Sequence, residues 1–233
     1  ILIKQVSFID AFWSMGFVVL AWMATAATGM DAISQVVILA MVSLWGVRLS
    51  YHLLTRWWGE GEDKRYIKLM GDREGLRRHI FSLIGVFGLQ GAIILIISAP
   101  LLDTLLTGAT ALSTLSYIGI ALFAVGLFFE VVGDAQLRAF KANPDNKGKV
   151  LNTGLWRYTR HPNYFGDACI WWGMWMVSAN LSLIFAPIIM TALLYKGSGV
   201  PILERNLKKN RPGYEDYIAS TSTFIPMPPK QTS

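Results

Sequence analysis

Residues 152–167, which read NTGLWRYTRHPNYFGD, concentrate side chains that could bind a ligand. The stretch holds two arginines, two tyrosines, a histidine, an aspartate and Asn163. Arginine forks match the oxygens of a phosphate group, and the Asn163 carboxamide offers both a donor and an acceptor. A loop that only capped the next helix would need one or two of these groups. The stretch therefore predicts a ligand site.

Two helices are expected to position this site. Pro162 suits the first turn of a helix, so the polar groups before it lie at a helix N-terminus, which favours anions. An earlier helix ends in Glu130 and Asp134, four residues apart, and continues into Arg138 and Lys141. A face that runs from apolar to acidic to basic suits the rim of a polar pocket. A solvated helix end would show the same pattern.

The C-terminal part of the chain, from Val200 to Phe224, is amphipathic. Two interpretations are open for it. It could close over the site at residues 152–167, or it could be a basic surface helix.

A second set of ionisable residues falls within apolar segments, where such groups are costly and are functional candidates. Asp10 is either an N-cap at the interface or a carboxyl group that burial keeps protonated as a proton donor. Arg48 and His52 are four residues apart on one helical face, with Tyr51 beside them. Snorkelling to the headgroups is the alternative explanation for this trio. The mixed charges of residues 57–66 are interpreted as ion pairs at the surface.

The composition requires a membrane. Of 233 residues, 53% are hydrophobic and 15% are charged, whereas a soluble domain carries about a quarter charged residues. A membrane-crossing helix needs about 20 apolar residues. The segments that meet or approach this length lie near residues 8–27, 31–54, 79–101, 112–132, 164–178 and 180–196. The predicted fold is an all-α polytopic membrane bundle of six to seven transmembrane helices, forming one domain over residues 1–233.

Lysine and arginine residues occupy one side of this topology. They precede the first segment and fill the connections after the second, fourth and sixth segments, and the other connections hold none. The positive-inside rule makes their side cytoplasmic. The net charge of +6 is thereby explained without a nucleic acid. We predict no metal site and no obligate protein partner, and the single cysteine, Cys169, forms no intrachain disulfide.

Several short motifs resemble the C-terminal signature of the steroid 5α-reductase superfamily. They are GLW at 154–156, RHPNYFGD at 160–167, LE at 203–204, Tyr217 and IP at 225–226. The superfamily also includes sterol reductases, and isoprenylcysteine carboxyl methyltransferases share a looser form of the signature. The match covers about residues 115–228. The run WGEGEDKRY at 58–66 resembles the bacterial branch, which implies a bacterial inner membrane.

The resemblance implies NADPH bound from the cytosol among the C-terminal helices. It also implies seven membrane helices, so a seventh is expected ahead of Ile1 or within the segments above. The residues that it assigns to the cofactor are Asp134, Arg138, Lys141, Arg157, Tyr158, Arg160, His161, Asn163, Tyr164, Asp167 and Glu204.

The implied reaction is that of a 3-oxo-5α-steroid 4-dehydrogenase, in which a hydride reaches the β-carbon of a lipophilic enone that enters from the surrounding membrane lipid. Steroid reductases use a Gln-Glu pair on an early helix to activate the carbonyl, and this chain has no such pair there. The expected acid is Asp10, with Tyr51 or His52 in support. Two alternatives are an S-adenosylmethionine-dependent membrane methyltransferase and a non-enzymatic lipid-binding protein.

Overall fold

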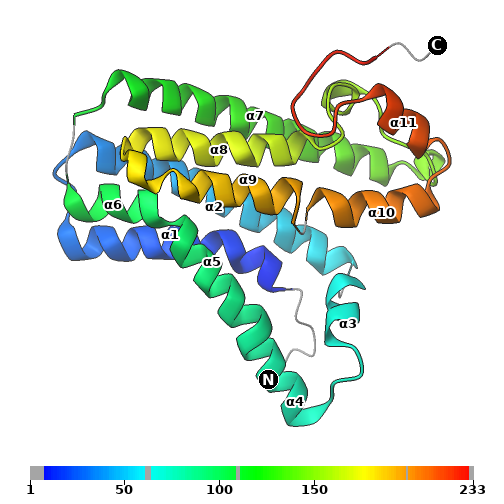
Figure 1. The fold of residues 1–233 in the computed structure, drawn as a ribbon, viewed down its shortest axis with the longest axis horizontal. Helices are drawn as coiled ribbons and strands as arrows, with labels where there is room; N and C mark the ends of the chain where they lie inside the picture. The colour runs from blue at the N-terminus through cyan, green and yellow to red at the C-terminus, as the bar shows by residue number, and fades with distance from the viewer. Residues whose placement is uncertain (1–7, 61–63, 109–110, 198, 231–233) are drawn as a thin grey trace. The chain divides into compact units, whose positions relative to one another are not determined.

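The structure, a computed structural model, describes residues 8–60, 64–108, 111–197 and 199–230. Every regular element in these ranges is a helix, and no strand occurs among them (Figure 1). Five stretches of the described residues are long and apolar enough to cross a bilayer: Ile9–Thr28, Ile33–Trp58, Gly75–Ile97, Thr114–Ala142 and Leu181–Asn210. The protein is therefore a polytopic helical membrane protein, as the sequence predicts.

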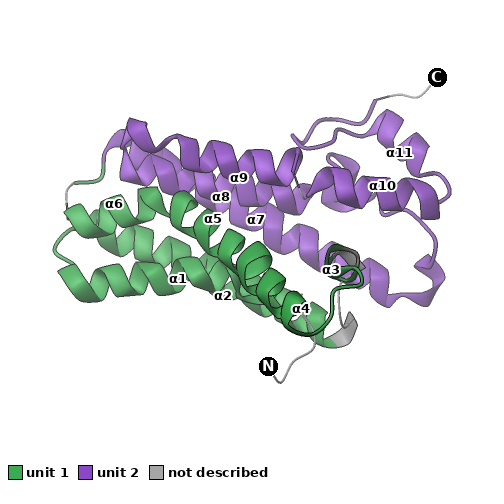
Figure 2. Cartoon of the chain, turned by 60° about the horizontal axis from the view of Figure 1, so that its bottom comes forward, with its two compact units in different colours: residues 1–112 green, residues 113–233 purple. Residues whose placement is uncertain are grey.

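The chain divides into two compact units, residues 1–112 and 113–233 (Figure 2). The first unit contains α1 (Ile9–Thr28), α2 (Ile33–Glu60), α3 (Lys64–Met70), α4 (Gly75–Phe81), the π-helix η1 (Ser82–Gly88), α5 (Leu89–Ile97) and α6 (Ala99–Thr107). The second contains α7 (Thr114–Ala142), η2 (Pro144–Asn146), η3 (Gly154–Arg157), α8 (Pro162–Ser178), η4 (Leu181–Leu183), α9 (Phe185–Tyr195), α10 (Val200–Asn210) and α11 (Tyr214–Ser220). The predicted single domain stays a prediction.

Within the first unit, α1 and α2 are joined by buried polar contacts. The Ser14 hydroxyl donates to the carbonyl of Gly46 at 2.9 Å, and Ser50 donates to that of Ala11. Small hydroxyl residues that bond across helices replace the hydrophobic driving force that lipid removes. These bonds hold the N-terminal turns of α1, where Asp10 lies, against α2.

The predicted segment 79–101 is corrected by the structure. A continuous helix starts earlier, at Gly75, contains a π-helical stretch, and ends at Ile97, after which α6 begins at Ala99. Pro100 lies in the first turn of α6, where a missing backbone N–H has no cost. It could not continue α5, because a proline inside a helix removes a hydrogen bond and clashes with the preceding turn.

Within the second unit, α7 and α8 pack with their backbones in close approach through pairs of glycines. A Cβ on Gly126 would lie 2.5 Å from the carbonyl oxygen of Gly166, and a Cβ on Gly119 would lie 2.5 Å from that of Gly173. The glycines are seven residues apart on each helix, which is about two turns, so they share one face. Small residues at this spacing let helices approach closely in a membrane.

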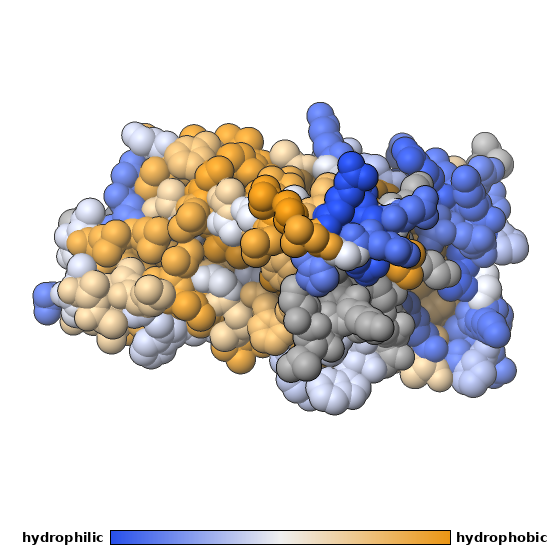
Figure 3. All heavy atoms as spheres, turned by 90° about the horizontal axis from the view of Figure 1, so that it is seen from below, coloured by the Kyte–Doolittle hydropathy of each residue, from blue (hydrophilic) through white to orange (hydrophobic). Residues whose placement is uncertain are grey.

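Large apolar side chains are exposed on many helices, among them Leu83 and Ile84 in η1. Figure 3 shows hydrophobic side chains gathered over a broad part of the face that it draws. Because a soluble protein rarely exposes large contiguous apolar patches, these surfaces are suited to contact lipid tails.

Candidate functional site

Arg160 is the centre of the polar cluster in the second unit. Its side chain is 6% exposed, in the turn between η3 and α8. Its Nε donates to Glu204 Oε1 at 2.7 Å, and its Nη2 donates to Thr223 Oγ1 at 2.8 Å. Its Nη1 donates to the carbonyls of Ile218 and Thr221. The guanidinium therefore joins α10, α11 and the segment that follows them.

Glu204 and His161 complete this cluster. The Nε2 of His161 lies 3.1 Å from the same Glu204 oxygen that Arg160 contacts. The His161 ring stacks on that of Tyr164, with centroids 5.5 Å apart and planes 8° from parallel. One carboxylate thus aligns a guanidinium and an imidazole, and the stacking fixes the imidazole against α8.

The segment from Thr221 to Met227, which we call the C-terminal strap, is held by hydrogen bonds to the turn between η3 and α8. The Arg160 amide donates to Ser222 O, and the Met227 amide donates to Tyr158 O, both at 2.9 Å. Thr159 Oγ1 donates to Phe224 O at 2.8 Å. The amphipathic C-terminal region therefore does close over residues 152–167, which was one of the two sequence interpretations. The sequence analysis missed Thr159, whose only signal was its place within the motif.

Two tyrosines of α11, Tyr214 and Tyr217, are also buried. Tyr217 donates to the carbonyl of Trp156. Burial raises the pKa of Tyr217 above its usual range, and the neighbouring Tyr214 adds to this shift. Burial, together with the negative charge of Glu204, raises the pKa of Tyr214. Both phenols are therefore neutral at physiological pH and act as structural groups.

Asn163 connects α8 to α7. Its Nδ2 donates to Asp134 Oδ1 at 3.0 Å, and its Oδ1 accepts from the Tyr164 amide at 3.1 Å. Asp134 is buried on α7, and Asp167 is buried one turn after Asn163 on α8. The structure thus brings together Asn163 and Asp134, two residues that the resemblance assigned separately to the cofactor.

The remaining predicted cofactor residues lie at the surface of the second unit. Arg138, Lys141, Arg157 and Tyr158 are exposed at the end of α7 and in η3 and the residue after it. Exposed cations near a buried amide–carboxylate pair fit a ligand that carries phosphate groups at one end and a carboxamide at the other. NADPH is such a ligand. Arg160 fits the phosphates less well, because its Nε, Nη1 and Nη2 all donate to protein acceptors.

The first unit contains a separate polar cluster around Asp10. The Tyr66 hydroxyl donates to Asp10 Oδ1 at 2.5 Å, and Gln90 Nε2 donates to the Tyr66 oxygen at 3.0 Å. The three residues come from α1, α3 and α5. Tyr66 is buried in an apolar cluster with Met70 and Val86. A carboxyl–phenol pair in such surroundings can supply a proton to a substrate oxygen.

The sequence analysis missed both Tyr66 and Gln90. Tyr66 ends the mixed-charge run that was interpreted as surface ion pairs, and the charged side chains of residues 60–65 lie outside the description, so their pairing stays a prediction. Gln90 had a usable signal, since it is an amide within an apolar segment. Tyr51 is 67% exposed and His52 is half-buried on α2. Their predicted support of Asp10 stays a prediction.

Sequence comparisons assign the family. The sequence model of the family described as "Protein of unknown function (DUF1295)" matches residues 1–221. The chain belongs to the DUF1295 family. Curated relatives match this DUF1295 chain over shorter stretches, and no solved structure matches it.

Two relatives of this DUF1295 protein have different printed activities. The chain is 36% identical over 93 residues to the probable O-methyltransferase ustE of Ustilaginoidea virens, covering 39% of this chain and 32% of that protein. It is 28% identical over 109 residues to 3-oxo-5-alpha-steroid 4-dehydrogenase 1 of Rattus norvegicus, covering 46% of this chain and 40% of that protein. The matches thus span less than half of each relative. They support the steroid 5α-reductase superfamily and do not select a member.

Proposed function

We propose that the protein is an NADPH-dependent reductase of a lipophilic enone such as a 3-oxo-Δ4-steroid. The observation that carries this proposal is the Tyr66–Asp10 hydrogen bond in an apolar part of the first unit. Reduction of an enone places negative charge on the carbonyl oxygen, and a positioned acid stabilises that charge. A methyl transfer from a sulfonium donor develops no such oxyanion, so it gives an acid no negative charge to stabilise.

The residues of the second unit would hold the cofactor. Arg138, Lys141 and Arg157 would contact its phosphates, and Asn163 and Asp134 would bind its carboxamide or ribose. When bound, NADPH supplies a hydride to the β-carbon of the substrate. Arg160 would act as a positioning residue, since it aligns Glu204 and the strap.

The residues of the first unit would handle the proton. Tyr66 would donate a hydrogen bond, and then its proton, to the substrate oxygen. Asp10 would pass a replacement proton to Tyr66 across the existing Tyr66–Asp10 contact. Gln90, which donates to the phenol oxygen, would orient the Tyr66 hydroxyl and stabilise any negative charge on it. The α-carbon of the resulting enol would then take a proton from water while the enol O–H returns its proton to the Tyr66–Asp10 pair, so that one hydride and one proton are added in all.

A membrane methyltransferase is the second candidate, and the 36% identity to a probable O-methyltransferase favours it. Its cofactor, S-adenosylmethionine, carries no phosphate, so a site for it would not need Arg138, Lys141 and Arg157 together. The positive-inside bias also places cations on this side, which is why a binding experiment is needed. The same bias supports our proposal that the cofactor residues face the cytoplasm of a bacterial inner membrane.

The deciding experiment is a thermal-unfolding titration of the detergent-purified protein with NADPH, NADH and S-adenosylmethionine. A ligand that binds only the folded state raises the melting temperature as its concentration increases. A rise with NADPH, weaker with NADH and absent with S-adenosylmethionine, is expected. A rise with S-adenosylmethionine alone would refute the reductase proposal. A charge-removing Arg157→Gln variant should weaken the NADPH response, and Arg205→Gln, in an exposed part of α10, serves as its control.

A further inference from the structure

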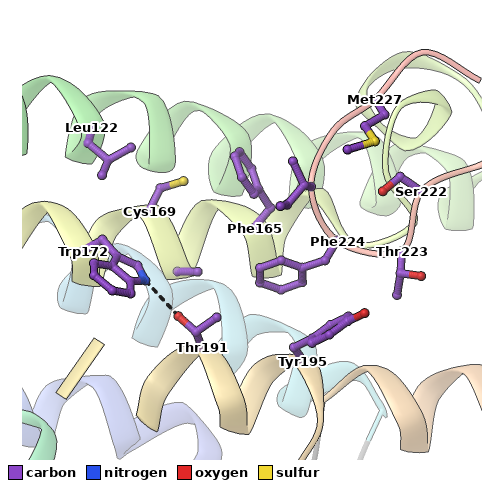
Figure 4. A pocket seen from close by; sticks show the side chains of 12 residues that line it. Leu122, Phe165, Cys169, Trp172, Thr191, Tyr195, Ser222, Thr223, Phe224 and Met227 are labelled. Carbon is purple, nitrogen blue, oxygen red and sulfur yellow. Dashed lines mark hydrogen bonds between the residues drawn. The ribbon is translucent and has the colours of Figure 1, made fainter. Parts of the chain in front are cut away.

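The second unit contains a cavity of about 530 Å³ between α7, α8, α9 and the C-terminal strap (Figure 4). This volume falls in the range of pockets that take small molecules, roughly 300–1,000 Å³. Phe165, Cys169 and Trp172 form its wall on α8, and Phe224 covers it from the strap. None of these residues is among those that we assign to the cofactor or to proton transfer.

The cavity lies on a different face of α8 from the cofactor residues. Asn163 and Asp167 are four residues apart and share one face, and Phe165 and Cys169 share another. The two sets are offset by two residues, which is about 200° around the helix axis. A ligand in the cavity would therefore lie on another face of α8 from Asn163 and Asp167.

The walls favour an uncharged ligand with rings. Phe165, Trp172, Tyr195 and Phe224 present four aromatic side chains to the cavity, and large aromatic surfaces suit flat, rigid ring systems. The described residues that line it include no lysine, arginine, aspartate or glutamate. A phosphate or carboxylate headgroup would be left without a counter-charge there, at high cost in free energy.

The cavity has polar groups at one end. In Figure 4, Ser222, Thr223 and the hydroxyl of Tyr195 lie toward one end, whereas Leu122, Cys169 and Trp172 lie toward the other. The indole N–H of Trp172 donates to Thr191 at 3.1 Å, so this wall group is already satisfied. Hydroxyl groups can donate or accept, so this end could bind a single hydroxyl or carbonyl group of the ligand.

We propose that this cavity binds an uncharged, ring-containing lipid that carries one hydroxyl or carbonyl group. Binding would not require reduction of the ligand, so the inference goes beyond the proposed function. Occupancy would stabilise the strap, because Phe224 and Thr223 contribute both to the cavity and to the contacts with Thr159 and Arg160.

The test uses androstanol, a saturated sterol that has one hydroxyl group and no enone and cannot be a substrate of the proposed reaction. Cys169 is the single cysteine of the chain and lines the cavity, so its alkylation by N-phenylmaleimide reports access. Androstanol should slow this alkylation by about tenfold. Palmitate at the same concentration should not, because its carboxylate has no partner in the cavity.

Matched variants locate the effect. Leu122→Trp fills the cavity and should weaken the androstanol response about tenfold. Ile118→Trp, one turn away on α7 at a position that is 54% exposed, should leave the response unchanged. If Leu122→Trp fails to fold, Ile225→Asp places a charge at the edge of the cavity, and Ile202→Asp on α10 is its control.

Three results would overturn the proposal. The first is equal protection by palmitate and androstanol, and the second is equal protection in Leu122→Trp and the wild type. The third is a thiol that reacts only after unfolding, which would mean that the cavity is closed to molecules of this size. Because androstanol has no enone, each of these results leaves the proposed reduction untouched.

Discussion

The polar clusters of the two units are built in different ways. Arg160 in the second unit bonds to two side chains and to the carbonyls of Ile218 and Thr221, which fix it in one position. Tyr66 in the first unit donates to the Asp10 carboxylate and accepts from the Gln90 amide. A group with many backbone partners is held in place, whereas a phenol between two side chains can change its hydrogen-bond partner. In our proposal the Arg160 cluster is structural and the Tyr66 cluster transfers a proton.

The helices near the two clusters also differ, in how regular and how closely packed they are. In the second unit, α7 and α8 are locked by backbone contacts at Gly126 and Gly166. In the first unit, the helix that carries Gln90 contains the π-helical stretch Ser82–Gly88 just before it. Mid-helix π segments are rare and frequently occur at functional sites. One unit thus has a closely packed helix pair, and the other has an irregular helix that carries Gln90, a contact of Tyr66.

Removal of the Tyr66 hydroxyl should have the largest effect, and it should be on catalysis. Tyr66→Phe keeps the apolar ring and loses the acid, so kcat for NADPH-dependent reduction of progesterone should fall by about 10²–10⁴-fold. The melting temperature should change little. Tyr117→Phe, at an exposed position on α7, is the control. An unchanged kcat in Tyr66→Phe would remove Tyr66 from the mechanism and weaken the contrast between the clusters.

Loss of the Arg160 side chain should instead act on stability. Arg160→Leu leaves the half-buried Glu204 without this partner, and breaking a buried ion pair costs about 3–5 kcal/mol. Thermal unfolding should show this loss, and limited proteolysis should cut near the freed strap. The exposed Arg205→Leu should do neither. Equal protease resistance of Arg160→Leu and the wild type would show that the strap does not depend on this residue.

A methyl group added between α7 and α8 should also lower the stability, by less than the loss of the Arg160 side chain. Gly126→Ala would place a Cβ 2.5 Å from the Gly166 carbonyl oxygen, and overpacking of this kind costs about 1–3 kcal/mol. Gly91→Ala in α5 has no atom within 4 Å of the added Cβ and should be neutral or slightly stabilising. Equal melting temperatures of the two variants would show that the helix pair is not rigid.

The pH dependence of stability should show the smallest effect. Burial raises the pKa of Tyr217 when the protein folds, so the folded state disfavours the phenolate. The contribution of the neutral Tyr217 phenol to stability is fully present below the unfolded pKa of about 10 and is lost as pH rises above that value. At neutral pH the free energy of unfolding of Tyr217→Phe should be about 1 kcal/mol lower than that of the wild type. Between pH 9 and 11 it should fall by less than that of the wild type, because the variant has no phenol to ionise. Equal slopes in thermal-unfolding measurements over this range would contradict a buried neutral phenol.

Much of the fold could be predicted from local patterns. Apolar runs of membrane-spanning length indicate helices because each helix satisfies its own backbone hydrogen bonds. A span was correctly expected near residues 79–101, but its bounds were not, because that apolar run contains both the end of α5 and the start of α6. The break at Ser98 depends on Pro100, which the hydropathy pattern alone does not weigh.

The candidate site was predicted in part. The motif at 152–167 indicated residues that meet α7, α10 and the strap, but the contact between Asn163 and Asp134 came only from the structure. The motif could not indicate which arginine is exposed. Arg157 and Arg160 are three residues apart in the same string, yet one faces outward and the other is buried.

By itself the sequence determined the helical membrane class, the segregation of basic residues and the resemblance to the steroid 5α-reductase superfamily. These properties follow from hydrophobicity, charge order and motifs, which are local features of the sequence and do not depend on how the helices pack. Only the tertiary structure decided that Tyr66 meets Asp10, 56 residues away, and that Arg160 meets Thr223, 63 residues away. Such pairings depend on how helices pack within each unit, because a side chain reaches only a few ångströms and its partners are set by that packing.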